Sequence, residues 1–355
     1  MQAVLRKLIT LVALAGAAIV LVASVPAGAS ALVRAEPAHT PSHHAHKTKR
    51  HKSKRHKSHL KKQKRHKQAP ATHKAATTGA NCGGEVPAAK PGGGAWTCSF
   101  DDEFDAATGD ATALNTNVWV PQVTATSGYT TGPLTDQACY ENSPANISVS
   151  GGYLHLTALK ASSLFDCSGL TFPLTQYTSG MVSTYEKFSQ TYGRFEVRAE
   201  MPQADAKGLQ ETLWLWPDND TLYGKEPASG EIDFSEFYSQ YFDDDIPYVH
   251  YGYTSSTANT KTNTNIVTAE CPLNPAQFND YALVWEPGTL TISVNGVTCL
   301  TDNYVPDDGV DSPAPFDQGF FLALTQALGV TTNAFNPSTT PLPATTLIKY
   351  VRVWQ

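Results

Sequence analysis

The sequence has 355 residues, 41% hydrophobic and 10% aromatic, which is enough apolar material for a buried core. Its charge is divided unevenly along the chain. Thirteen Lys and Arg lie between Lys47 and Lys74, whereas ten Lys and Arg and 31 Asp and Glu follow Lys74. The part after Lys74 therefore has a net charge of −21, which argues against anionic polymers as substrates and favours a neutral one.

Residues 1–29 are predicted to be a secretory signal peptide. Basic Arg6 and Lys7 precede an apolar run over 8–25, and small residues follow at 27–31. We expect the mature protein to be extracellular, with association to the cell wall as a further option, and without stable membrane insertion. The alternative is an uncleaved membrane-spanning helix, for which the run is just long enough.

Residues 30–94 are predicted to be a disordered basic linker followed by a Gly- and Pro-rich lead-in. The stretch HHAHKTKRHKSKRHKSHLKKQKRHK has no acidic and no aromatic residue, so it has little to bury. It is either a solvated spacer or an electrostatic tether to an anionic cell-wall polymer, and its histidines lack a metal-binding pattern. We expect no nucleic-acid partner, because an exported chain meets little nucleic acid.

The six cysteines all lie after the basic linker. An even number of cysteines in an exported chain favours disulfides, although fifteen pairings are open to six cysteines. Our hypothesis is that nearest neighbours pair, as Cys82–Cys98, Cys139–Cys167 and Cys271–Cys299. No cysteine–histidine cluster and no Gly-rich phosphate loop stands out, so the sequence predicts neither a metal nor a cofactor.

Residues 95–355 are predicted to be one all-β domain. Short alternating or apolar runs recur, as at 153–160, 194–201 and 346–354, and turn residues separate many of them. Val294-Asn295-Gly296-Val297 is a strong hairpin signal. Because no long stretch shows a helical period, we expect a β-sandwich.

The stretch Gly230–Phe237, GEIDFSEF, places the carboxylates Glu231, Asp233 and Glu236 on a strand whose other side chains are mostly apolar. Buried acids repel each other and lose solvation, so stability does not explain them. In a regular strand Glu236 would face away from the other two, but a bulge at Phe234-Ser235 would bring all three to one face. Two converging carboxyl groups, one nucleophile and one proton donor, are what retaining glycoside hydrolysis requires.

GEIDFSEF resembles the active-site strand of glycoside hydrolase family 16, the laminarinase-like enzymes, in its bulged form E-x-D-x-x-E. YTSGMVST, YGRFEVRAEMP, LWLWP, HYG and YVRVW come in the family's order, so the resemblance spans roughly residues 96–355. It implies a jelly roll of two curved antiparallel sheets with a concave glycan cleft. It also implies that Glu231 is the nucleophile, that Glu236 is the acid/base, and that Asp233 hydrogen-bonds the nucleophile and tunes both pKa values.

Four further residues are candidates for substrate binding. Trp214 and Trp216 alternate with leucines and share one face, where they either stack on sugar rings or pack in the core. Arg194 matches the family's cleft arginine in G-R-F-E, with a structural ion pair as the alternative. His250 in HYG matches a cleft histidine near the acid/base, with a buried core histidine as the alternative.

The sequence departs from the family pattern in two places. Gln210 and Glu211 stand where members often carry the Trp and Pro of W-P-A-x-W, which leaves the sugar contact there and the glucan linkage open. Lys349 stands where members often carry an Asp that binds a structural calcium, which argues against that ion.

With the predicted signal peptide, the resemblance and the charge predict a secreted, retaining endo-β-glucanase acting on β-1,3 or mixed β-1,3/1,4 glucan. We expect it to be a monomer. A transglycosylase on the same glucans is the alternative among enzymes. A non-catalytic glucan-binding module and a cell-wall structural protein are alternatives of other classes, and the intact Glu231 and Glu236 argue against the module.

Overall fold

The computed structural model describes residues 81–106, 113–168, 174–204, 206–252, 266–275, 277–306 and 310–355. The predicted signal peptide and residues 30–80 of the predicted linker lie outside the described residues. Among the described residues, no helix is both long enough and apolar enough to span a bilayer.

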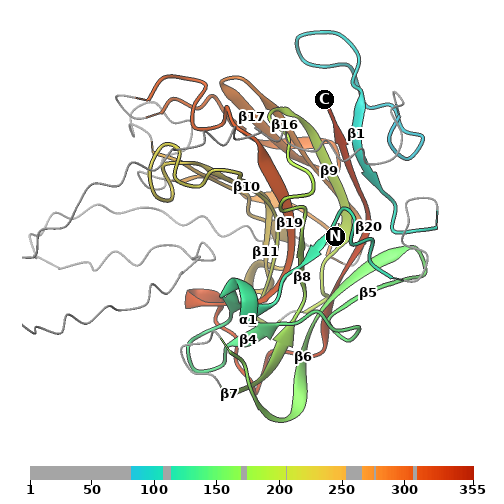
Figure 1. The fold of residues 1–355 in the computed structure, drawn as a ribbon, viewed down its shortest axis with the longest axis vertical. Helices are drawn as coiled ribbons and strands as arrows, with labels where there is room; N and C mark the ends of the chain where they lie inside the picture. The colour runs from blue at the N-terminus through green and yellow to red at the C-terminus, as the bar shows by residue number, and fades with distance from the viewer. Residues whose placement is uncertain are drawn as a thin grey trace, which may run out of the picture. The chain divides into compact units, whose positions relative to one another are not determined.

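One of the two sheets, which we call the outer sheet, has eleven strands (Figure 1). The strand order is β18-β17-β16-β9-β20-β6-β7-β4-β3, with β1 on β20 and β5 on β6. Its strands are β1 (Cys98–Asp102), β3 (Thr130–Thr131), β4 (Ala138–Tyr140), β5 (Ile147–Ser150), β6 (Tyr153–Asp166), β7 (Leu174–Ser179), β9 (Gly193–Glu200), β16 (Asn279–Glu286), β17 (Thr289–Val294), β18 (Val297–Asp302) and β20 (Ala344–Trp354).

The other sheet, which we call the carboxylate sheet, has nine strands in the order β14-β13-β11-β10-β19-β8-β2, with β12 and β15 beside β11. Its strands are β2 (Val120–Pro121), β8 (Met181–Ser183), β10 (Leu209–Pro217), β11 (Glu231–Tyr238), β12 (Asp244–Asp245), β13 (Tyr248–His250), β14 (Ile266–Thr268), β15 (Cys271–Pro272) and β19 (Phe320–Leu328). The described helices are α1 (Thr124–Ser127), η1 (Ser239–Tyr241) and η2 (Thr331–Asn333). Among the strands that the structure describes, every pair is antiparallel except β4–β7, so the predicted all-β sandwich of two antiparallel sheets is confirmed apart from this one parallel pair.

The core lies between the two sheets and follows the alternation of side chains along each strand. On β9, Phe195 and Val197 point inward and are at most 1% exposed. On β11, Ile232, Phe234 and Phe237 are fully buried in the same cluster. Removing such side chains from water is the main stabilising contribution, at about 25 cal/mol per Å². The core therefore fixes β11 by its apolar face and leaves its acidic residues on the other face.

The predicted hairpin at Val294–Val297 is confirmed. Val294 on β17 pairs with Val297 on β18, and the two residues between them form the turn. Asn295 and Gly296 have φ values of 52° and 75°, the left-handed conformation that a two-residue hairpin turn requires.

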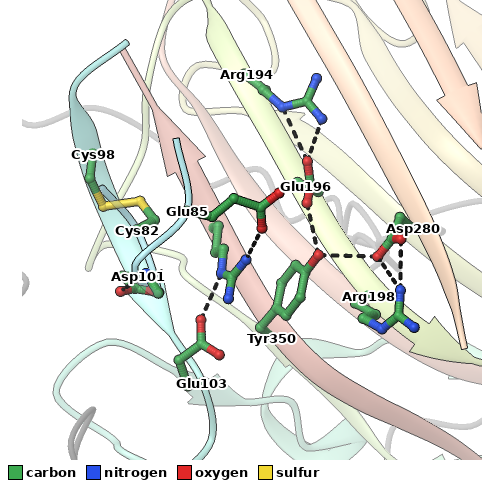
Figure 2. Close-up of polar contacts among 12 residues, drawn as sticks. Cys82, Glu85, Cys98, Asp101, Glu103, Arg194, Glu196, Arg198, Asp280 and Tyr350 are labelled. Carbon is green, nitrogen blue, oxygen red and sulfur yellow. Dashed lines mark hydrogen bonds and ion pairs between the residues drawn. A yellow bond between two sulfur atoms is a disulfide. The ribbon is translucent and has the colours of Figure 1, made fainter. Parts of the chain in front are cut away.

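The three predicted disulfides are confirmed as Cys82–Cys98, Cys139–Cys167 and Cys271–Cys299. Loops of this length typically gain about 3 to 4 kcal/mol from closure. The disulfide between Cys82 and Cys98 ties the lead-in to β1 (Figure 2). Arg352 on β20 holds the same region through ion pairs with Glu103 at 2.7 Å and with Glu85 at 2.5 Å. The folded part therefore includes Cys82 and Glu85, which precede the domain boundary expected at residue 95.

Candidate active site

A β-bulge on β11 brings the three carboxylates to one face of the carboxylate sheet. In the pairing with β10, Leu213 is opposite Ser235 and Trp214 is opposite Asp233, so Phe234 is the extra residue. Its ring is fully buried in the core. The bulge expected from the sequence is confirmed, and it turns Glu236 to the same side as Asp233.

Glu231, Asp233 and Glu236 are each at most 3% exposed. His250 on β13 pairs with Glu231 in the strand register, and its Nε2 lies 3.3 Å from Asp233 Oδ2. Asp233 was expected to hydrogen-bond Glu231, but the partner that the structure shows for it is His250. Glu231 Oε2 is buried without a hydrogen-bond partner, so this oxygen is not committed to a structural contact.

The side chains of Glu231, Asp233 and His250 offer ligand atoms within 4.8 Å of one another, which is close enough to hold a metal ion. Two carboxylates and an imidazole are ordinary ligands for a divalent transition metal. The sequence predicts no metal here, and that stays a prediction.

The pKa values of the three carboxyl groups are raised well above their usual range. Burial raises the pKa of Glu231, Asp233 and Glu236, and the charge of Asp233 further raises the pKa of both glutamates. His250 opposes this effect on the two glutamates. Because adjacent buried carboxylates cannot all ionise together, the cluster retains protons above the usual range for carboxyl groups. A proton donor that works near neutral pH needs this property.

Three residues that surround the carboxylates were not predicted from the sequence. Tyr238 donates a hydrogen bond from its hydroxyl to Glu236 Oε2, and Gln210 donates from Nε2 to Glu236 Oε1 at 3.2 Å. Glu226, from the loop before β11, raises the pKa of Asp233 by its charge. The signal for Tyr238 was its position two residues after Glu236, whereas Gln210 and Glu226 join the site only through tertiary structure.

Trp214 and Trp216 share the face of the carboxylate sheet that carries Asp233, as the alternation predicts. Their ring centroids are 5.9 Å apart at an edge-on angle of 82°, and they are 6% and 7% exposed. Trp214 donates from Nε1 to Thr325 Oγ1 at 2.9 Å, and Phe321 packs in the same cluster. These contacts make both indoles part of a packed aromatic cluster, and their stacking on sugar stays a prediction.

The placement predicted for Arg194 is wrong. Arg194 lies on β9 in the outer sheet, where its neighbour Phe195 points into the core, so the arginine faces away from the core and from the carboxylates. Its guanidinium pairs with Glu196, which also accepts a hydrogen bond of 2.8 Å from the Tyr350 hydroxyl (Figure 2). The alternative of a structural ion pair is therefore the one that the structure shows.

Asp245 on β12 accepts a hydrogen bond from the bulge. Ser235 donates from Oγ to Asp245 Oδ1 at 2.7 Å, and Asp245 is fully buried. Burial raises the pKa of Asp245 from 3.8 to about 7. The bulge therefore rests on a carboxyl group that is largely protonated at mildly acidic pH.

Asp245 is expected to make folding less favourable as the pH rises. The native state holds this proton above pH 4 while the unfolded chain has lost it, so the free energy of unfolding falls as pH rises from about 4 to about 7. Asp245→Asn, which keeps the acceptor for Ser235, should reduce that fall by up to roughly 4 kcal/mol. Denaturant titrations at pH 4.5 and 7.5 measure the free energy of unfolding of each variant, with Asp220→Asn, at an exposed position, as the control. If the free energy of unfolding fell equally in Asp245→Asn and in the wild type, the role of Asp245 would be contradicted.

Known proteins share sequence with the segment that carries this geometry. The model of glycosyl hydrolases family 16 matches residues 153–316, which include the three carboxylates. The chain is 29% identical over 263 residues to glucan endo-1,3-beta-glucosidase A1 of Niallia circulans, covering 72% of this chain and 37% of that protein. It is 32% identical over 186 residues to keratan-sulfate endo-1,4-beta-galactosidase of Sphingobacterium multivorum, covering 50% and 40%. The chain thus spans less than half the length of these two relatives.

The fold has close counterparts among solved structures. The X-ray structure of the laminarinase from Rhodothermus marinus superposes with a TM-score of 0.58 at 26% sequence identity, covering 73% of this chain and 97% of that one. This likeness confirms the jelly-roll sandwich of two curved sheets expected from the sequence. The matched segment, the bulged strand and the shared architecture together confirm the resemblance of this chain to glycosyl hydrolases family 16 and to the laminarinases in particular.

Proposed function

We propose that the protein is a secreted endo-β-glucanase that hydrolyses β-1,3 or mixed β-1,3/1,4 glucan with retention of configuration. The observation that carries this proposal is the bulged strand β11, which presents Glu231 and Glu236 on one buried face with raised pKa values. Retaining hydrolysis needs one carboxylate and one carboxylic acid side by side, and this environment supplies both.

The two glutamates take complementary roles in the proposed reaction. Glu231, whose Oε2 has no hydrogen-bond partner, attacks the anomeric carbon, while Glu236 protonates the departing glycosidic oxygen. The resulting glycosyl ester on Glu231 is then hydrolysed by water, from which Glu236 removes a proton. Asp233 and its partner His250 lie beside Glu231 and adjust the charge that it carries.

A neutral β-1,3-linked glucan is the substrate class that we propose. The relative from Niallia circulans and the solved structure from Rhodothermus marinus bear the names of a glucan endo-1,3-beta-glucosidase and a laminarinase. The relative from Sphingobacterium multivorum acts, by its name, on keratan sulfate. The net charge of −21 after Lys74 would repel a sulfated chain, so it favours the neutral glucan.

A substrate panel tests the function. The protein is incubated with laminarin, lichenan, xyloglucan, agarose, carrageenan and keratan sulfate, and the products are sized. We expect laminarin or lichenan to yield a ladder of oligosaccharides, with the β-anomer appearing first in the NMR spectrum. Products longer than an oligosaccharide substrate would indicate transglycosylation instead. Binding of laminarin without cleavage of any polymer would overturn the proposal in favour of a glucan-binding module.

We further propose that the basic segment before Lys74 tethers the extracellular enzyme to an anionic cell-wall polymer. Thirteen Lys and Arg and nine His within residues 39–74 give it a strong positive charge at mildly acidic pH. Deleting residues 37–77 should leave turnover of soluble glucan unchanged but abolish retention on isolated walls at low salt, because screened charges lose their attraction. A Gly/Ser linker of equal length is the matched control, and retention by that control would refute the tether.

A further inference from the structure

Both carboxylate oxygens of Glu236 already have a donor in the structure. The Tyr238 hydroxyl donates to Oε2, and Gln210 donates from Nε2 to Oε1 at 3.2 Å. The two donors come from neighbouring strands, because Gln210 on β10 is directly opposite Tyr238 on β11. Glu236 itself is 3% exposed, so these contacts are made away from bulk water. One hydrogen bond to each oxygen defines the orientation of the carboxylate plane.

Other groups also face Glu236 from the surrounding strands. The titratable ones are Glu231 and Asp233 on β11 and His250 and Tyr248 on β13. Burial and the charge of Asp233 raise the pKa of Glu236, whereas the hydrogen bond from Tyr238, His250 and the hydrogen bond from Gln210 lower it. The two donors are thus the direct contacts that favour the ionised form against burial and repulsion.

We propose that Tyr238 and Gln210 are a pair of positioning residues that orient Glu236 and stabilise the negative charge that it acquires when it gives up its proton. This inference rests on the proposed function. Gln210 stands where the family pattern often has a tryptophan, so the pair is a feature of this chain rather than one carried over from the motif.

Tyr238 and Gln210 stabilise the charge on Glu236 in the first half of the reaction, when the glycosyl-enzyme forms. A bond forms between a Glu231 oxygen and the anomeric carbon, the glycosidic C–O bond breaks, and its electron pair takes the proton from Glu236. Negative charge then appears on the oxygens that Tyr238 and Gln210 contact. Hydrogen bonds to a charged oxygen are stronger than those to a neutral one, so both contacts strengthen as the proton leaves.

Leaving-group dependence tests this role. Tyr238→Phe and Gln210→Met each remove one donor, and Tyr241→Phe, at a residue of helix η1 that is 46% exposed, is the matched control. Rates are measured on the β-1,3-glucan and on an aryl β-glycoside whose nitrophenolate leaves without protonation. Each donor variant should lose roughly 10-fold in kcat/KM on the glucan but less than about 3-fold on the aryl glycoside. The basic limb of kcat/KM against pH should move up by about one pH unit, since a hydrogen bond to a charged group is lost.

The outcomes distinguish a failure of the role proposed for Tyr238 and Gln210 from a failure of the proposed function. An equal loss on both substrates, or a basic limb that does not move in either variant, would show that the pair serves only structure and would overturn the inference. Melting temperatures identify a variant that misfolds, and the other variant then decides. If the wild type cleaves neither substrate, the proposed function itself fails, and the inference falls with it. A wild type that is active on both, with unshifted variants, leaves the function standing and removes only the role of the pair.

Discussion

Glu231→Gln is expected to lower kcat on β-glucan by about 10⁴-fold or more, and to do so equally for every substrate. The amide cannot attack the anomeric carbon, so neither polymer nor activated aryl glycoside can form the glycosyl-enzyme. Steady-state rates on laminarin and on an aryl β-glycoside measure the loss. Glu200→Gln, in the outer sheet, is the control and should retain wild-type rates.

The stereochemistry of an azide product assigns the role of Glu231 more sharply. In Glu231→Ala the space of the missing carboxylate admits azide, which attacks the anomeric carbon directly from that face. One inversion gives an α-glycosyl azide, which NMR distinguishes from the β-form. Wild-type turnover in Glu231→Ala, or a β-azide from it, would show that Glu231 is not the nucleophile.

Glu236→Ala is expected to reduce glucan hydrolysis by about 10²- to 10⁴-fold, because both the proton donor and the later base are gone. An aryl glycoside with an activated leaving group needs no protonation, so this variant should still form the glycosyl-enzyme and then stall. A burst of released aryl alcohol, followed by a slow steady state, measures this behaviour. Mass spectrometry should find the sugar esterified to Glu231.

Azide should rescue Glu236→Ala, since this small anion needs no general base. It attacks the glycosyl-enzyme and completes a second inversion, so the product is a β-glycosyl azide. Together with the α-product from Glu231→Ala, this result distinguishes the two glutamates without further structural data. Failure of azide to restore turnover, together with no burst, would contradict the acid/base role of Glu236.

The features that the sequence determined by itself are those with local causes. The bulge at Phe234 follows from the spacing of the three acids and the apolar residues between them. Only an extra residue lets all three acids lie on one face of the strand while the apolar side chains face the core. The hairpin at Asn295-Gly296 follows from the left-handed backbone that this dipeptide tolerates. The shared face of Trp214 and Trp216 follows from the alternation of side chains, and in each case the structure agrees.

The tertiary structure alone decided which residues surround the carboxylates. Arg194 was assigned to the cleft by its motif, yet β9 belongs to the outer sheet, and the sheet in which a strand pairs is not encoded in its own residues. Gln210 reaches Glu236 because β10 lies next to β11 in one particular register, and Glu226 reaches Asp233 through a loop. Such contacts depend on pairings between distant segments, which the packing of the whole core selects.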